Sequence, residues 1–299
     1  MKNYKLAIDI GGTFIKYALV DDKYELKEKW KVKSEKFDDK DKFYDYVCSN
    51  IKEMDLVDSI GVSAPGVIGD DSTVKSHVAP NVDIIFGTNI NNEIKKRTNK
   101  ITRTINDAKS AGLCEVKLGN AKGTSSSVFL ILGTGTGGCV GNKDGVIIGK
   151  DGVAGEFHKL PSVDYKTGER KCMGDYASIT ALISIYNGKV DESSKVEYGT
   201  EVCNKYLSGD ETAKEAVTEW INNIVTQLLT IVVFYNPEII CIGGGISEED
   251  WFIKLLRDVF KEQCVKHVEA DVVTTKIDRC KYNNDANLIG AVLNLEDNK

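Results

Sequence analysis

Two glycine- and threonine-rich turns, each lying between apolar, strand-like runs, constrain this chain more than any other feature of its sequence. The turns are Gly11-Gly12-Thr13 and Gly133-Thr134-Gly135-Thr136-Gly137-Gly138, and the flanking runs are 4–10, 14–20, 128–132 and 139–143. Glycine lets a backbone turn tightly and approach a ligand closely, and successive N–H groups then form a concavity that binds anions. The pair predicts that a nucleotide polyphosphate is held from two sides. Two ordinary hairpin turns are the alternative.

The residues after both turns favour strands. A Gly-x-Gly-x-x-Gly dinucleotide site needs a strand followed by a helix, so the sequence argues against that kind of site. Elsewhere, strand-like and helix-like segments alternate along the chain, which predicts an α/β fold. We expect strands at 26–32, 59–62, 101–105, 239–242 and 271–276, and helices at 38–54, 89–97, 107–115, 213–235 and 288–295, with another opening at Ser247.

Composition limits the functional class. The chain has 299 residues, enough for two domains, and its net charge of −6 and lack of long basic runs argue against a nucleic-acid partner. A strand beginning at residue 4 leaves no room for a signal peptide, and the apolar stretch Leu228–Tyr235 is too short to span a membrane. Eight widely spaced cysteines fit buried, reduced thiols better than a disulfide framework. We therefore expect a cytoplasmic protein.

Two aspartates at strand ends are candidates for chemistry. Asp9 directly precedes the first turn, where a carboxylate can hold Mg²⁺ through water beside phosphates; a turn-capping role is the alternative. Asp107, in Asn106-Asp107-Ala108, can accept the proton of an attacking hydroxyl, or it can cap a helix. The same tripeptide recurs at 284–286, before the terminal helix. We assign catalysis to Asp107 and helix capping to Asp285.

Two further segments carry candidate ligands. In the small-residue loop 152–158, Glu156 can bind a polyol and His158 can assist, although a lone histidine is more often structural. The third glycine run, Gly243-Gly244-Gly245, leads from a strand towards Ser247. It can pack against an adenine or a ribose, or it can be a tight turn with Ser247 as the helix N-cap.

Together these motifs resemble the ROK family of bacterial sugar kinases, over nearly the whole chain. The resemblance implies a two-lobed actin/hexokinase-like (ribonuclease H-like) fold with mixed sheets and a cleft, divided into 1–107 plus 288–299 and 108–287. It implies Asp107 as the base and sugar contacts from Asn81, Asn106, Asp107, Glu156 and His158. It also implies ATP and phosphate contacts from Asp9, Gly11, Gly12, Thr13, Lys16, Gly133, Thr134, Gly135, Thr136, Gly137, Gly243, Gly244 and Gly245.

Two departures from the family pattern concern one loop. The family commonly shows Gly-Glu-x-Gly-His, whose histidine contacts the sugar and binds a structural zinc, whereas this chain has Glu156-Phe157-His158-Lys159. Either His158 or Lys159 takes that position. Only Cys172 remains where the family has a cysteine cluster, so we expect no zinc site.

The sequence thus predicts an ATP- and Mg²⁺-dependent kinase that phosphorylates a hexose, glucokinase-like, at the 6-hydroxyl. Kinases for N-acetylmannosamine, another amino sugar or a β-glucoside are the alternatives within this class. Outside it stand a sugar-sensing repressor, which would need an N-terminal helix-turn-helix, and a nucleotide-driven assembly protein of the actin type. The resemblance also implies a homodimer.

Overall fold

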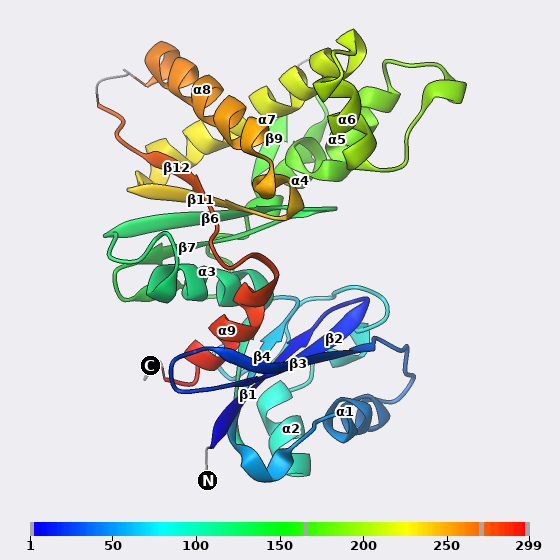
Figure 1. Cartoon of the computed structure of the whole chain (residues 1–299), viewed down its shortest axis with the longest axis vertical. Helices are drawn as coiled ribbons and strands as arrows, with labels where there is room; N and C mark the ends of the chain where they lie inside the picture. The colour runs from blue at the N-terminus through cyan, green and yellow to red at the C-terminus, as the bar shows by residue number, and fades with distance from the viewer. Residues whose placement is uncertain (1–2, 164–166, 269–271, 297–299) are drawn as a thin grey trace. The chain divides into compact units, whose positions relative to one another are not determined.

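The computed structural model describes residues 3–163, 167–268 and 272–296, and in it the chain forms two compact units. Unit 1 comprises Met1–Gly119, Asp144–Ala154 and Tyr282–Lys299, and unit 2 comprises Asn120–Lys143 and Gly155–Lys281. Both combine sheets with helices, which confirms the predicted α/β class (Figure 1). The domain boundaries expected at 107/108 and 287/288 stay a prediction.

Unit 1 is built on a mixed sheet. Its strand order is β3-β2-β1-β4-β5, in which β1, β2 and β3 are antiparallel neighbours while β1, β4 and β5 run parallel. The strands of this sheet are β1 (Tyr4–Ile10), β2 (Phe14–Val20), β3 (Leu26–Lys33), β4 (Val57–Ala64) and β5 (Ile101–Asn106). Unit 1 also contains the short β8 (Gly145–Ile147), which is not part of this sheet. The predicted strands 4–10 and 14–20 match the structure residue for residue.

Helices cover both faces of this sheet (Figure 1). They are α1 (Lys40–Ser49), α2 (Ile90–Thr98), α3 (Asp107–Leu118) and α9 (Ala286–Leu293), with 3₁₀ turns at Met54–Leu56, Asp83–Ile85 and Asn283–Asp285. Apolar residues of α1 and α2 share a core with Leu6, Ile8 and Ile10 of β1. On the other face, Leu288 and Val292 of α9 pack against Ala7. The first strand and the last helix therefore share one core.

Unit 2 has a second mixed sheet and a layer of helices. Within this unit the strand order is β12-β11-β6-β7, with β6 and β7 antiparallel and β6, β11 and β12 parallel. The strands are β6 (Ser126–Leu132), β7 (Thr136–Asn142), β11 (Ile239–Gly243) and β12 (Lys276–Arg279), plus the hairpin β9 (Pro161–Val163) and β10 (Arg170–Cys172). The helices are α4 (Met173–Ala177), α5 (Ile179–Asn187), α6 (Gly199–Leu207), α7 (Glu211–Tyr235) and α8 (Asp250–His267), with 3₁₀ turns at Phe157–Lys159, Glu192–Ser194 and Gly245–Glu248.

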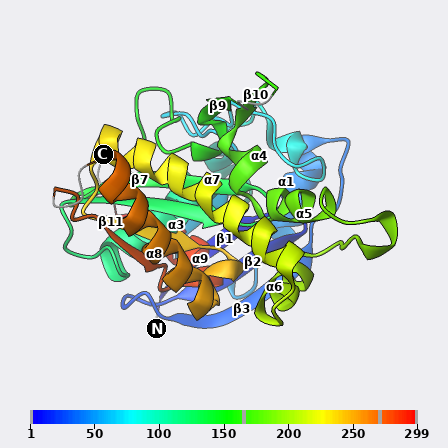
Figure 2. The same cartoon turned by 90° about the horizontal axis from the view of Figure 1, so that it is seen from above.

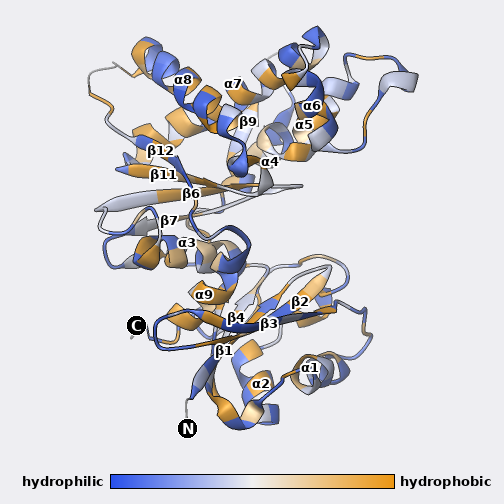
Figure 3. Cartoon of the chain, viewed as in Figure 1, coloured by the Kyte–Doolittle hydropathy of each residue, from blue (hydrophilic) through white to orange (hydrophobic). Residues whose placement is uncertain are grey.

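The long helix α7 forms the centre of the unit 2 core. It lies beside α8 (Figure 2), and its buried Trp220 packs against Phe252 of α8 at a ring separation of 5.4 Å. Hydrophobic and hydrophilic residues alternate along both helices (Figure 3). Among the described helices, α7 is the one that by length and composition could cross a membrane, but half of its most apolar window is buried in this core. Core packing therefore explains its apolar sequence.

Three predictions about local structure are wrong. The strand expected at 59–62 is too short, because β4 runs from Val57 to Ala64. Ser247 was proposed as a helix N-cap, yet it lies in a 3₁₀ turn and α8 begins at Asp250. The strand expected at 271–276 is found instead at Lys276–Arg279; residue 271 lies outside the described residues.

Candidate functional site

In unit 1, strand register brings the two candidate aspartates to the same edge of the sheet. Asp9 of β1 is opposite Ser63 of β4, and Ser63 is opposite Ile105 of β5, so all three lie at the carboxyl ends of parallel strands. Neighbouring strands are about 5 Å apart. Asp9 is therefore two strand spacings from the strand end that leads into Asn106 and Asp107, and unit 1 brings both carboxylates to one edge.

The Asp9 carboxylate is buried and held by three side chains. It is 4% exposed, and its Oδ1 accepts hydrogen bonds from Ser63 Oγ at 2.8 Å and Asn287 Nδ2 at 3.2 Å. Lys16, its cross-strand neighbour, places Nζ 3.2 Å from Oδ2. The sequence analysis did not identify Ser63 or Asn287 as partners. Nothing in the local sequence connects Asn287 of α9 with Asp9.

The first glycine turn is braced by the protein itself. Gly11 N donates to Phe14 O at 3.1 Å, and the buried Ser34 donates from Oγ to Gly11 O at 2.5 Å. Asn81 Nδ2 donates to Gly12 O at 3.2 Å. The structure therefore brings Asn81, predicted to contact the sugar, to the turn predicted to contact phosphate.

The loop that carries Asn81 is anchored by an aspartate. Asp83 Oδ1 accepts a hydrogen bond from the backbone N–H of Val78 at 2.8 Å, and its other oxygen lies 3.0 Å from His77 Nδ1. The Val78 N–H, and then His77, hold the pKa of Asp83 below its usual range. This anchor keeps residues 78–83 in a defined turn beside Gly12.

Asn106 both starts helix α3 and orients Asp107. Its Oδ1 accepts from Lys109 N at 3.1 Å as the N-cap, while its Nδ2 donates to Gly66 O and to Asp107 Oδ1, each at 2.9 Å. The capping role considered for Asp107 thus belongs to Asn106. Asp107, partly exposed, also accepts from Ala108 N at 2.7 Å. Its carboxylate is fixed by two donors to the same oxygen.

The second copy of the tripeptide behaves differently, and the capping role predicted for Asp285 is wrong. Asp285 makes no side-chain capping bond at the start of α9. Its carboxylate instead pairs with Lys29 Nζ at 2.9 and 3.0 Å, on the surface of unit 1.

Glu156 and His158 lie in unit 2, at the 3₁₀ turn Phe157–Lys159 that follows β8 in the chain. Glu156 Oε2 is 3.5 Å from His158 Nδ1, and the Glu156 side chain is only 15% exposed. Gly155 fixes the start of this turn: its φ is +77°, and a Cβ there would lie 2.3 Å from Cys139 Cα. Only glycine fits so close to β7, and this approach positions Glu156 at the strand.

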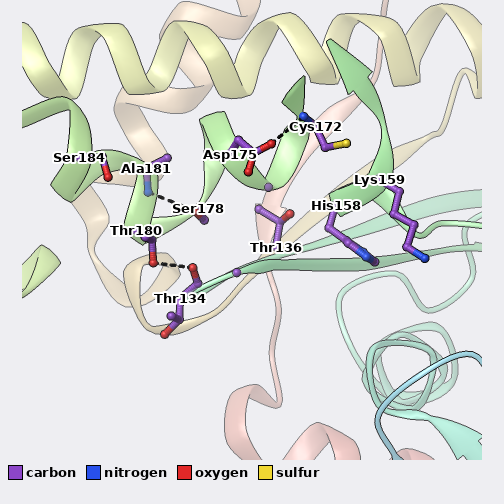
Figure 4. Close-up of a pocket in the computed structure, with 12 residues that line it drawn as sticks. Thr134, Thr136, His158, Lys159, Cys172, Asp175, Ser178, Thr180, Ala181 and Ser184 are labelled. Carbon is purple, nitrogen blue, oxygen red and sulfur yellow. Dashed lines mark hydrogen bonds between the residues drawn. The ribbon is translucent and has the colours of Figure 1, made fainter. Parts of the chain in front are cut away.

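The second glycine turn opens onto a cavity of about 700 Å³ in unit 2 (Figure 4). Helix α5 supports the turn on one side, because Ile179 N donates to Gly133 O and Thr180 Oγ1 donates to Thr134 O, both at 2.8 Å. Around Gly135 there is no atom within 4 Å of the place a Cβ would occupy. The turn therefore has room for close approach by a ligand.

The walls of this cavity combine hydroxyl groups with nitrogen-bearing side chains. Thr136, Ser178 and Thr180 contribute hydroxyls, while His158 and the exposed Lys159 contribute nitrogen atoms (Figure 4). The Thr136 hydroxyl is buried and makes no hydrogen bond to any described residue. A buried hydroxyl without a hydrogen-bond partner destabilises the folded protein, and a ligand oxygen that accepts a hydrogen bond from it offsets this cost. These features fit a phosphate-bearing nucleotide.

The third glycine run lies next to the second turn. Gly243 of β11 is opposite Ile131 of β6, just before the turn at 133–136. At Gly244, φ is +89° and a Cβ would lie 2.0 Å from Leu132 O, so no other residue fits there. Gly245 has open space around its Cβ position. Unit 2 thus brings together 133–137 and 243–245, the segments predicted to contact phosphate and nucleoside.

One carboxylate of unit 1 is a candidate ligand for Mg²⁺. Within residues 3–163, 167–268 and 272–296, no three histidine, cysteine, aspartate or glutamate side chains cluster as metal ligands. Mg²⁺ needs only one or two carboxylates, with water and substrate phosphates completing its shell. Asp9 offers one such carboxylate beside the first glycine turn, and its Oδ2 lies 3.2 Å from Lys16 Nζ.

Comparison with known proteins relates the whole chain to one family. The model of the ROK family matches residues 5–297. An N-acetylgalactosamine kinase from Shewanella sp. is 27% identical over 272 residues, 85% of each chain. Two solved structures share the fold. A Streptococcus pneumoniae ROK family protein in complex with sucrose has a TM-score of 0.85 at 24% identity, covering 98% of this chain and 97% of that one.

The second is a Streptomyces griseus ROK family glucokinase in complex with glucose and AMPPNP. Its TM-score is 0.77 at 22% identity, with coverage of 97% of this chain and 98% of the other. These likenesses confirm the predicted actin/hexokinase-like fold. Because the family model spans almost the entire sequence, the chain belongs to the ROK family.

Proposed function

We propose that this protein is an ATP-dependent sugar kinase that transfers the γ-phosphate to the 6-hydroxyl of a hexose. The observation that carries the proposal is the shared sheet edge of unit 1, where Asp9 and the oriented carboxylate of Asp107 both lie at the ends of parallel strands. In open α/β sheets, ligands bind outside the carboxyl ends of the strands. The named relatives that phosphorylate or bind sugars support the same reading.

In this proposal Asp107 is the general base. Phosphoryl transfer depends on positioning and on electrostatic stabilisation of the charge that moves towards the leaving group. Asn106 Nδ2 and the Ala108 N–H both donate to Oδ1 of Asp107. In this proposal, that anchoring turns Oδ2 of the same carboxylate towards an attacking hydroxyl. Asn81, Asn106, Glu156 and His158 would hydrogen-bond the sugar.

We propose a separate role for the candidate nucleotide contacts of each unit. Asp9 would hold Mg²⁺ through water, and the metal would neutralise phosphate charge during transfer. The turns at 11–13 and 133–137 would donate N–H groups and hydroxyls to phosphate oxygens, with Lys16 as an added cation. Gly243, Gly244 and Gly245 would lie against the nucleoside. We further propose a cytoplasmic location and a homodimer.

The twin tripeptides provide a matched test of the base. Asp107→Asn keeps the shape and the acceptor oxygen for Ala108 N but removes the basic carboxylate, so turnover should fall by about 10³-fold or more. Asp285→Asn changes the same residue in the same local sequence, on the surface, and should keep wild-type turnover. The measurement is sugar phosphate formed per enzyme, with the fold checked by circular dichroism. Near-normal turnover by Asp107→Asn would sink the assignment.

An amino sugar is the second candidate substrate. The Shewanella relative acts on N-acetylgalactosamine, and the His158-Lys159 pair departs from the usual family pattern in the loop proposed to contact the sugar. ADP release over glucose, mannose, fructose, N-acetylated hexosamines and β-glucosides ranks these substrates. Carbon NMR of the product identifies the phosphorylated hydroxyl. If no sugar stimulates ADP release, the kinase proposal fails.

A further inference from the structure

Among the described residues that line the unit 2 cavity, Lys159 is the one with an ammonium group, and the proposed function gives it no role. Its side chain is exposed, and no carboxylate of the described chain lies within ion-pair distance of its Nζ. Its neighbour His158 differs, because His158 Nδ1 is 3.5 Å from Glu156 Oε2. Figure 4 shows both side chains at one edge of the cavity. The two candidates for one sugar contact therefore have different surroundings.

The backbone on either side of Lys159 is held in place. Phe157 and Leu160 pack against the core of unit 2. Phe157 lies against Gly138 of β7, where a Cβ would be 2.4 Å from the phenyl ring, so only glycine leaves room for it. On the other side, Met173 N at the start of α4 donates to Leu160 O at 2.9 Å. A ligand therefore meets an ammonium group on an ordered backbone, which lowers the entropic cost of binding.

A buried hydroxyl of the same cavity has no hydrogen-bond partner. Thr136 is 8% exposed, and its Oγ1 makes no hydrogen bond to any described residue. The 3₁₀ turn lies close to this hydroxyl: a Cβ built on Gly174 would be 3.6 Å from Thr136 Oγ1 and 3.5 Å from His158 O. Such a hydroxyl indicates that a ligand oxygen belongs beside it.

We propose that Lys159 binds a phosphate group of the nucleotide and supplies the positive charge of the second glycine turn; this inference rests on the proposed function. The turn itself offers only neutral donors, its N–H groups and hydroxyls. A hydrogen bond from an ammonium group to phosphate is about twice as strong as a neutral one. Asp175, the one carboxylate among the described lining residues, accepts from Cys172 N at 2.8 Å at the first turn of α4. It lies beyond ion-pair distance of Lys159 and leaves that charge for the ligand.

The test is isothermal titration of the full-length protein, without sugar, with ADP, inorganic tripolyphosphate and adenosine as separate probes. Lys159→Gln should weaken the binding of ADP and tripolyphosphate by about tenfold, because one charged contact to phosphate is lost, and should leave adenosine binding unchanged. The loss should shrink as the salt concentration rises, because salt screens an exposed charge. Lys254→Gln is the matched control: it removes the same charge from an exposed position of α8, outside the cavity, and should bind every probe as wild type.

A second variant separates charge from packing. Lys159→Arg keeps the positive charge and should retain most of the wild-type affinity for ADP. Wild-type affinity for ADP in Lys159→Gln would overturn the proposal, as would an equal loss for adenosine or an equal loss in Lys159→Arg. Weaker binding of glucose with unchanged binding of ADP would assign Lys159 to the sugar instead.

Sugar phosphorylation is measured separately, so that the two proposals fail independently. If ADP binds through Lys159 but no sugar is phosphorylated, the kinase proposal fails and the phosphate contact stands. If a sugar is phosphorylated while Lys159→Gln binds ADP as wild type, the kinase proposal stands and the phosphate contact fails.

Discussion

The two glycine turns look alike in sequence but differ in how the protein surrounds them. In unit 1, Ser34 and Asn81 hydrogen-bond the carbonyl groups of Gly11 and Gly12, and the buried Asp9 directly precedes the turn. In unit 2, helix α5 supports the turn on one side, while the other side opens onto a cavity. The first turn is held by hydrogen bonds and lies beside a carboxylate, whereas the second turn borders a cavity. A shared motif therefore does not imply a shared task.

Among the tests that compare the two turns, the largest effect is expected for the carboxylate beside the first turn. Asp9→Asn keeps an oxygen for Ser63 but removes the charge that would hold Mg²⁺, so turnover should fall by roughly 10²–10³-fold. Half-maximal activity should also need more Mg²⁺. Asp22→Asn, which removes the same charge from the exposed turn after β2, is the control. A normal Mg²⁺ titration curve for Asp9→Asn would rule out the metal role.

An intermediate effect is expected from adding one methyl group to each turn. At Gly11 a Cβ would lie 2.9 Å from Phe14 O, so Gly11→Ala should lower the free energy of unfolding by about 1 kcal/mol or more. At Gly135 the space is open, so Gly135→Ala should unfold like wild type. The ATP KM of Gly135→Ala should nevertheless rise about tenfold, because the methyl group occupies the space of a phosphate. Urea denaturation and steady-state kinetics give the two readouts. Equal effects of both substitutions on stability would remove the contrast between the turns.

The smallest effect concerns the buried hydroxyl in the second turn. Thr136→Val replaces that hydroxyl with a methyl group of similar size and should raise the free energy of unfolding by up to about 1 kcal/mol. If the hydroxyl serves the nucleotide, the ATP KM should rise a few-fold. Ser127→Ala removes another buried hydroxyl without a partner in the described structure, on β6, and should stabilise without changing the KM. An unchanged ATP KM in Thr136→Val would show that the Thr136 hydroxyl does not contact the nucleotide, which would leave the backbone groups of the second turn for that contact.

The sequence predicted those elements whose pattern is local. Strands β1 and β2 were correct because apolar, strand-forming residues fill both and two glycines separate them. Helix α7 was nearly correct because its buried side chains keep helical spacing. The strand near residue 276 was misplaced: the β-branched residues 272–275 favour a strand, but it is Lys276–Arg279 that pairs with β11.

Less of the site could be predicted from the sequence, because tertiary contacts complete it. The candidate aspartates could be found, since each lies at the end of a strand. Their partners could not: Ser63 reaches Asp9 through strand register, and Asn287 reaches it from the last helix. The contrast between Asp107 and Asp285 also required the structure, because identical tripeptides differ only in what surrounds them. Whether each residue acts as proposed stays a prediction.

Helix α9 has a consequence for how the protein is made. It packs on β1, and its Asn287, 278 residues further along the chain, binds Asp9. A ribosome-bound chain that lacks α9 cannot close the core of unit 1, and contacts so distant in sequence form slowly. We expect nascent unit 1 to depend on chaperones until α9 has been synthesised. Premature termination near residue 285 should yield an inactive, rapidly degraded product, although every proposed catalytic residue is already present.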